Sequence, residues 1–290
     1  MVGMISRRPK GTPTGGQFAP GARAEVDVDL AEGPVRTVRP DGTEEWCLNG
    51  QLHREDGPAV VSPDGTQEWW QNGQLHREDG PAVVDSDGTE EWYWRGGVHR
   101  EDGPAIVHPD GTEKWYRNDE LHREGGPAIV GSDGSESWIR EGLLHREDGP
   151  AIVTLDGAQW WQNGQHHRED GPATVRSDGA EEWWQHNGLH RRGGTAVVTA
   201  DGAQEWWQSN RRHREDGPAV VYPDGYQAWY QDDRRHREDG PAAVTANGSE
   251  AWYRNGTLHR EDGPAVVWSD GTEEWWQHGR RMGPPPSGST

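Results

Sequence analysis

Short apolar and polar blocks alternate along most of this chain, and the same order of blocks returns about every 23 residues. In one copy, the aromatic block 66–71 is followed by Asn72-Gly73, a polar block, the apolar block 81–84 and Asp87-Gly88. Neither the aromatic block nor the apolar block has a helical period. Both contain the β-branched or aromatic residues that strands favour. Asn-Gly and Asp-Gly are turn dipeptides. The pattern therefore predicts that each copy is strand, turn, strand, turn.

A His-Arg pair marks each of the ten copies, from His53 to His259, and the interval is 23 residues except for the 22 between His145 and His167. His-Arg-Glu-Asp is intact in eight copies and Gly-Pro-Ala in nine. A single hairpin is marginally stable in water, so stability must come from stacking. We expect an all-β fold, an elongated single antiparallel sheet of about ten tandem hairpin repeats of about 23 residues. A two-strand-per-coil β-solenoid with the same turns is the alternative.

The two ends differ from the repeats in composition. Residues 1–30 form a basic, Gly- and Pro-containing leader, residues 31–279 the repeat array, and residues 280–290 a Pro-, Gly- and Ser-rich tail that we expect to be disordered. The leader is either a flexible tail or a docking peptide with Phe18 as its one large apolar anchor.

Composition and charge narrow the function classes. Only 30% of the chain is hydrophobic, yet it has 18 Trp, which sets it apart from disordered segments. A net charge of −21 argues against nucleic-acid binding, which relies on Lys and Arg. The single cysteine, Cys47, excludes an internal disulfide framework and a multi-Cys zinc site. No apolar run is long enough for a membrane span, so we expect a cytoplasmic protein.

The order Trp-x-x-Asn-Gly-x-x-His-Arg-x-Asp-Gly, followed by an apolar strand and Asp-Gly, resembles the MORN repeat over about residues 31–279. It is most similar to the variant MORN repeats of bacteria and phages, some of which are called antitoxin-like. The chain departs from the family pattern because Arg54, Arg77 and Arg100 stand where that pattern has glycine. The resemblance implies a scaffold or binding protein built of antiparallel hairpins. Separately, residues 11–19 resemble a leader found in actinobacterial and actinophage proteins.

Two adjacent aromatic rows run through the repeats. We interpret the first as a structural ladder, represented by Trp69, Trp92 and Trp115. Adjacent residues of a strand point to opposite faces, so the second row should lie on the other face, where it is a candidate binding surface. The second row comprises Trp70, Tyr93, Tyr116, Trp161, Trp184, Trp207, Tyr230, Tyr253 and Trp276.

The His-Arg-Glu-Asp motif is the most chemically suggestive feature. Equivalent histidines of successive units would lie ~10 Å apart, too far to share one metal ion. We therefore interpret His76, His99 and His122 as parts of a structural ladder of ion pairs and hydrogen bonds. The alternatives are a weak divalent-ion site within one unit and acid/base chemistry. We predict no catalytic residue, no metal site and no cofactor, because no copy differs from the others in a way that would form one distinct pocket.

These observations favour a non-enzymatic scaffold that binds another protein, in an antitoxin, immunity or phage accessory role. The alternative is a carbohydrate- or envelope-binding module that uses an exposed tryptophan row. Edge strands at both ends of the array also allow end-to-end self-association.

Overall fold

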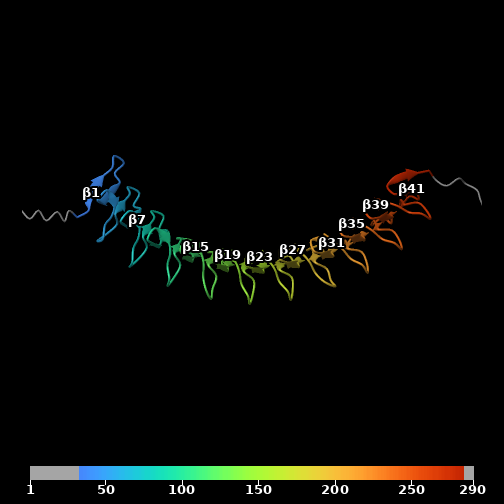
Figure 1. Cartoon of the computed structure of the whole chain (residues 1–290), viewed down its shortest axis with the longest axis horizontal. Coiled ribbons are helices and arrows are strands. Elements are labelled where there is room, and N and C mark those ends of the chain that lie inside the picture. The colour runs from blue at the N-terminus through green and yellow to red at the C-terminus, as the bar shows by residue number, and fades with distance from the viewer. Residues whose placement is uncertain (1–32, 284–290) are drawn as a thin grey trace, which may run out of the picture. The chain divides into compact units, whose positions relative to one another are not determined.

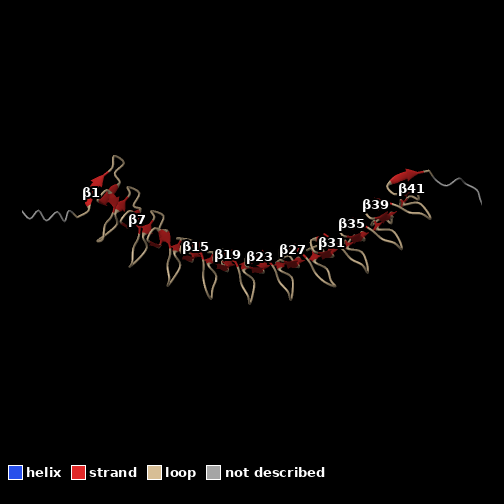
Figure 2. Cartoon of the chain, in the orientation of Figure 1, coloured by secondary structure: helices blue, strands red, loops and turns tan. Residues whose placement is uncertain are grey.

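The computed structural model describes residues 33–283, and every regular element among them is a β-strand. All strand pairings in this range are antiparallel, and 24 strands belong to one sheet. Figures 1 and 2 show these strands following one another from unit to unit, with loops between them. The expected all-β fold with one long antiparallel sheet is confirmed. The solenoid alternative is wrong, because stacked coils pair through parallel strands.

Within this sheet, strands that are hydrogen-bonded neighbours follow chain order. A strand from an apolar block lies between strands from the aromatic blocks of two successive units, as β8 does between β5 and β9. The sheet strands are β1 (Val35–Val38), β2 (Glu44–Leu48), β4 (Val60–Val61), β5 (Gln67–Glu68), β8 (Val83–Val84), β9 (Glu90–Glu91), β12 (Ile106–Val107), β13 (Glu113–Lys114), β16 (Ile129–Val130), β17 (Glu136–Ser137), β20 (Ile152–Thr154), β21 (Gly157–Gln159), β24 (Thr174–Arg176), β25 (Glu181–Glu182), β28 (Val197–Val198), β29 (Gln204–Glu205), β32 (Val220–Val221), β33 (Gln227–Ala228), β36 (Ala243–Val244), β37 (Glu250–Ala251), β40 (Val266–Val267) and β41 (Glu273–Gln277), with β3 (Gln51–Leu52) paired to β2 and β42 (Arg280–Met282) paired to β41.

The remaining strands form nine two-stranded hairpins beside the sheet. These are β6 (Trp70–Gln71) with β7 (Gln74–Leu75), β10 (Tyr93–Trp94) with β11 (Gly97–Val98), β14 (Tyr116–Arg117) with β15 (Glu120–Leu121), β18 (Ile139–Arg140) with β19 (Leu143–Leu144), β22 (Trp161–Gln162) with β23 (Gln165–His166), β26 (Trp184–Gln185) with β27 (Gly188–Leu189), β30 (Trp207–Gln208) with β31 (Arg211–Arg212), β34 (Tyr230–Gln231) with β35 (Arg234–Arg235), and β38 (Tyr253–Arg254) with β39 (Thr257–Leu258). A complete unit thus has four short strands, whereas the sequence pattern predicted two.

The extra strands arise because each aromatic block forks at its first tryptophan. The N–H of Trp69 donates to the carbonyl of Ala82 at 2.7 Å, toward the sheet. The carbonyl of Trp69 accepts the N–H of His76 at 2.9 Å, toward the hairpin. One residue has only one backbone donor and one acceptor, so the two ladders diverge at this point.

The turns explain how each hairpin closes. Asn72 and Gly73 have φ of 51° and 74°, so the predicted type I′ turn, which needs positive φ at both residues, is confirmed. The Asp-Gly turns differ, because Gly88 has a φ of 91° whereas Asp87 is not among the positive-φ residues. The Asp87 carboxylate accepts the N–H of Thr89 at 2.8 Å, and this bond lowers the pKa of Asp87.

A column of alanines forms the most deeply buried part of the array. In every unit the alanine of the Gly-Pro-Ala motif, or its equivalent Ala196, is 0% exposed. Its backbone is fully used: Ala82 donates to the carbonyl of Glu91 at 2.8 Å and accepts from Trp69. Because these alanines join each unit to the next, we place the core along this column.

The array extends slightly beyond its expected end. Arg280–Met282 form β42, which pairs with residues 275–277, so these three residues are part of the array and not of the tail. The pairing continues because β41 repeats the aromatic block of the other units. The leader 1–30 and residues 284–290 of the tail lie outside the described residues. Within residues 33–283 there is no helix with the length and apolar character needed to cross a bilayer.

Candidate interaction surface

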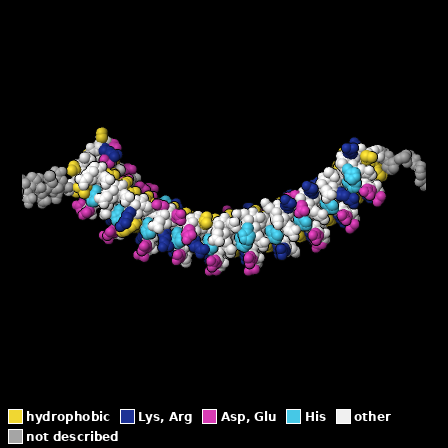
Figure 3. Space-filling model, viewed as in Figure 1, with side chains coloured by type: hydrophobic (Ala, Val, Ile, Leu, Met, Phe, Trp, Pro, Cys, Tyr) yellow, Lys and Arg dark blue, Asp and Glu magenta, His cyan; other side chains and the backbone are white. Residues whose placement is uncertain are grey.

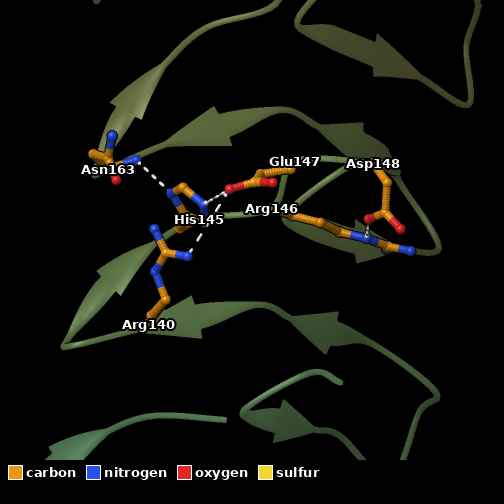
Figure 4. A network of polar contacts seen from close by, with 6 residues as sticks. All are labelled: Arg140, His145, Arg146, Glu147, Asp148 and Asn163. Carbon is orange, nitrogen blue, oxygen red and sulfur yellow. Dashed lines mark hydrogen bonds and ion pairs between the residues drawn. The ribbon is translucent and has the colours of Figure 1, made fainter. Parts of the chain in front are cut away.

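Each unit carries a loop, Arg-Glu-Asp-Gly-Pro in its common form, between its hairpin and the following sheet strand. In the loop of Arg146, the guanidinium carbon lies 3.8 Å from the ring centroid of Trp138. The same guanidinium donates to the carbonyl of Pro150 at 3.2 Å. It also donates to Asp148 at 3.2 Å, as Figure 4 shows. A cation–π contact and two hydrogen bonds thus hold the loop against the aromatic block. We call this arrangement the arginine clamp.

Glycine leaves room for the clamp. A Cβ at Gly149 would lie 2.9 Å from the Arg146 guanidinium carbon, so any side chain there would displace the arginine. The bond to Asp forms only at Arg54, Arg146 and Arg214 among residues 33–283. The rest of the clamp, the cation–π contact and the bond to the carbonyl of the residue after glycine, occurs in all ten units from Arg54 to Arg260, with ring distances of 3.8 to 4.2 Å. It persists where the motif varies, since Arg191 donates to the carbonyl of Thr195 at 2.9 Å.

Histidines couple each unit to the next. The backbone N–H of Asn163 donates to Nδ1 of His145 at 3.1 Å, across a unit boundary (Figure 4). Because Nδ1 accepts, the neutral ring carries its proton on Nε2. That nitrogen lies 3.6 Å from Glu147, which also lies 4.0 Å from Arg140. The His-Glu distance exceeds a hydrogen bond, so the firm contact of this histidine is the one to the neighbouring turn.

The histidines singled out from the sequence have the same contacts. His76, His99 and His122 accept turn N–H groups of the following unit, each at 3.2 Å. They therefore bond to the backbone and not to one another. Among residues 33–283, no group of three His, Cys, Asp or Glu side chains is arranged to hold a metal ion.

The carboxylates of the loops point into solvent. Side-chain exposure is 80% for Glu147 and 88% for Asp148, whereas the clamping Arg146 is 25% exposed. The space-filling view shows acidic side chains gathered at the outer edge of successive loops, with histidines nearer the sheet (Figure 3). Each loop thus has a fixed base and a charged, accessible tip, and we call the row of tips the acidic edge.

Grooves separate successive loops. One groove, of about 780 Å³, has Glu101 and Asp102 on one wall, Glu124 on the other, and Trp115 and Tyr116 between them. Equivalent residues line grooves between three other pairs of adjacent loops. The described units therefore repeat one kind of shallow polar site, with aromatic side chains at its base.

The first aromatic row, including Trp69, Trp92 and Trp115, lies beneath the clamps. At these three tryptophans, the guanidinium carbon of the clamping arginine lies 4.1, 4.0 and 3.9 Å from the ring centroid. Because the first tryptophan sits at the fork and not inside a continuous strand, the expectation that the two rows alternate across one flat sheet was too simple. Each of these tryptophans thus lies under the arginine of its own loop, and its backbone N–H donates to the carbonyl of the buried alanine of its unit.

The second aromatic row is half-buried at every position proposed from the sequence. Nε1 of Trp70 donates to Glu68 at 2.7 Å, and the Tyr93 hydroxyl donates to Glu91 at 2.8 Å. Residues from the second strand of each hairpin also contact the row: the ring of His166 stacks on Trp161 with centroids 4.7 Å apart. These side chains have partners within the array, and their indole and phenol groups are largely engaged there.

Comparison with known proteins assigns no family. No protein-family model matches the chain, and no curated protein is significantly similar to it. Among solved structures, the G-box domain of the microcephaly protein CPAP has 17% identity over 67% of this chain and 90% of its own, with a TM-score of 0.14. The TCP10 domain of Danio rerio CPAP, solved with a STIL peptide, has 16% identity over 83% of this chain and 97% of its own, with a TM-score of 0.17. TM-scores this low carry no argument about fold or function.

Proposed function

We propose that the array is a non-enzymatic scaffold that binds a protein partner along the acidic edge. The observation that carries this proposal is the repetition of exposed carboxylates at one loop position. Glu55, Glu78, Glu101, Glu124 and Glu147 are each between 71% and 87% exposed. Such a row offers many weak, equivalent contacts whose strengths combine when one partner engages several of them.

The clamps support this proposal because they fix the loops before any partner arrives. Each loop is tied down by a guanidinium on tryptophan and by a bond to the Pro carbonyl, as in Arg146 and Pro150. A pre-ordered surface loses less conformational entropy on binding than a mobile one. The exposed tips can therefore contribute to affinity without first being ordered.

Charge indicates the kind of partner. The chain has a net charge of −21, and the exposed Glu and Asp tips concentrate negative charge on one edge. Complementary potentials accelerate association and favour partners of opposite sign. We therefore propose a partner that presents Lys and Arg side chains.

Repetition also favours binding over catalysis. A catalytic site needs one pocket in which a distinct set of groups converges. Here the same His, Arg and Glu arrangement recurs in unit after unit, and the grooves between loops resemble one another.

The proposal is tested with a lysine-rich peptide as the probe and the full chain as the receptor. One variant carries Glu78→Gln, Glu101→Gln, Glu124→Gln and Glu147→Gln at the acidic edge. The control carries Glu90→Gln, Glu136→Gln, Glu250→Gln and Glu273→Gln on sheet strands, with the same change of charge. Isothermal titration at low salt should show about tenfold weaker binding for the edge variant only, and added salt should weaken binding to the parent chain. If both variants lose the same affinity for the peptide, the loss comes from the change in net charge alone, and the proposal is contradicted.

A further inference from the structure

Residues 222–253 break the repeat in a coordinated way. Four of the six tyrosines of the chain fall in this stretch, at Tyr222, Tyr226, Tyr230 and Tyr253. Tyr226 replaces the Thr that follows several other Asp-Gly turns, and Arg235 replaces the leucine that most hairpins carry at this position. Two further changes, to Ala228 and Ala251, occur where most other units have a charged or polar side chain, most often Glu.

These changes converge on the guanidinium of Arg235. It donates to the hydroxyl of Tyr226 at 3.0 Å, to that of Tyr230 at 3.2 Å and to that of Tyr253 at 3.5 Å. Tyr230 faces Arg235 across the β34–β35 hairpin, whereas Tyr253 comes from β38 of the next unit. Arg235 and the three tyrosines are half-buried, so the cluster is partly open to solvent.

Arg235 has no negative partner in this part of the chain. Within residues 33–283, no carboxylate forms an ion pair with it, and its guanidinium donates hydrogen bonds to tyrosine hydroxyls. The arginine at the same position one unit earlier differs, because Arg212 lies 3.2 Å from Glu205. The equivalent of Glu205 in the next unit is Ala228. A half-buried cation without a counter-charge is unfavourable, and an anion would stabilise it.

The tyrosines add donors to this positive charge. Each phenol oxygen accepts a bond from Arg235, so its own proton is left to donate elsewhere. Burial raises the pKa of Tyr226, so that phenol keeps its proton at neutral pH. Arg235 uses three of its five N–H groups on the tyrosines, which leaves two. Several donors around one cation match the acceptor oxygens of an oxyanion.

We infer that Arg235, Tyr226, Tyr230 and Tyr253 form a binding site for an oxyanion, a carboxylate or phosphate group on a ligand. The site is distinct from the acidic edge, which takes positive charge. It occurs in one place on the array and would give the otherwise uniform repeat a fixed point of recognition.

The test is isothermal titration of the full chain with inorganic phosphate and, separately, with acetate. Arg235→Leu restores the residue most other hairpins have and should weaken binding about tenfold or more. Arg212→Leu is the matched control, since that arginine is neutralised by Glu205, and its affinity should stay within about twofold of the parent. Tighter binding of phosphate identifies a phosphorylated ligand, and tighter binding of acetate identifies a carboxylate ligand; both support the site.

Circular dichroism of each variant establishes that the array remains folded. If Arg235→Leu does not fold, Tyr226→Phe removes one hydroxyl while keeping the ring and should weaken binding by a few fold. The inference is overturned if the parent chain binds neither anion, if the Arg235 or Tyr226 variant binds as well as the parent, or if Arg212→Leu loses as much affinity as Arg235→Leu.

Discussion

The two aromatic rows occupy adjacent residues of each unit, yet they are held in different ways. The first row is tryptophan in every unit. In each of the ten complete units, an arginine packs on the indole, and the loop glycine leaves the space that this arginine occupies. The second row varies among Trp, Tyr, Ile139 and Cys47, and its polar atoms reach neighbouring side chains such as Glu68. The first row therefore belongs to a fixed geometric unit, whereas the second fills space beside a hairpin and accepts several side chains.

The positions that stabilise the fold are therefore constant from unit to unit, whereas other positions vary. The fork, the clamp and the alanine column use the same few residue types in every unit, because backbone bonds and close packing leave no alternative. The second row and its hairpin neighbours change along the chain, from Leu75 through His166 to Arg235. Local chemistry such as the Arg235 cluster arises at these more permissive positions.

Adjacent tryptophans of one unit give the sharpest test of the comparison. Trp160→Ala should lower the free energy of unfolding by about 3 kcal/mol, because it removes the indole under Arg168 and empties the fork. Trp161→Ala should cost about half as much, since that ring stacks on His166 at the edge of a hairpin. Urea unfolding followed by circular dichroism measures both. Equal losses would mean that the two rows support the fold equally.

The clamp can be opened without touching an aromatic ring. Gly149→Ala places a methyl group 2.9 Å from the Arg146 guanidinium carbon and should cost about 1–2 kcal/mol through loss of the stacked geometry. Gly33→Ala is the control, because a Cβ there meets no atom within 4 Å. Thermal unfolding of the two variants compares them. A Gly149 variant as stable as the control would show that the clamp contributes little.

The stability of the fold should depend on pH at one histidine, His166, which stacks on Trp161 of the second row. Burial lowers the pKa of His166, so the folded protein resists protonation more than the unfolded chain does. Stability from this group is therefore present above its unfolded pKa of about 6.5 and is lost as the pH falls through the folded value. His166→Leu should reduce the loss of stability between about pH 7 and pH 5 by roughly 1 kcal/mol or less. Urea unfolding at the two pH values measures this, and an unchanged pH dependence would exclude a role for His166.

The sequence was sufficient to predict the all-β fold and the turns, because Asn72-Gly73 and Asp87-Gly88 act through local backbone preferences. It predicted two strands in each unit, whereas a complete unit has four. It did not reveal the fork, which depends on whether Trp69 bonds to Ala82, to His76 or to both. That choice is made by the tertiary arrangement of the loop between them. Periodicity within a block of six residues carries no such information.

The candidate site was predicted only in part. The interpretation of His76 as a ladder residue included hydrogen bonds, but it did not say that the donor is a backbone N–H of the next unit. The pairing of Arg77 with Trp69 was missed, although Gly80 and Ala82 recur with Arg77 in every one of the ten copies. An invariant Gly beside a repeated Arg signals close approach of that side chain, and this signal was present. The Arg235 cluster was also missed, because it appears only when departures from the repeat are compared position by position.

The most direct measurement of the central claim is capture of partners from native lysate, using the parent chain, the edge variant and the sheet control described above. Chemical cross-linking with mass spectrometry then identifies the residues in contact. We predict a basic protein that the parent and the sheet control retain, that the edge variant loses, and that cross-links to the loops. A protein or polysaccharide partner retained equally by all three chains would contradict a binding role for the acidic edge.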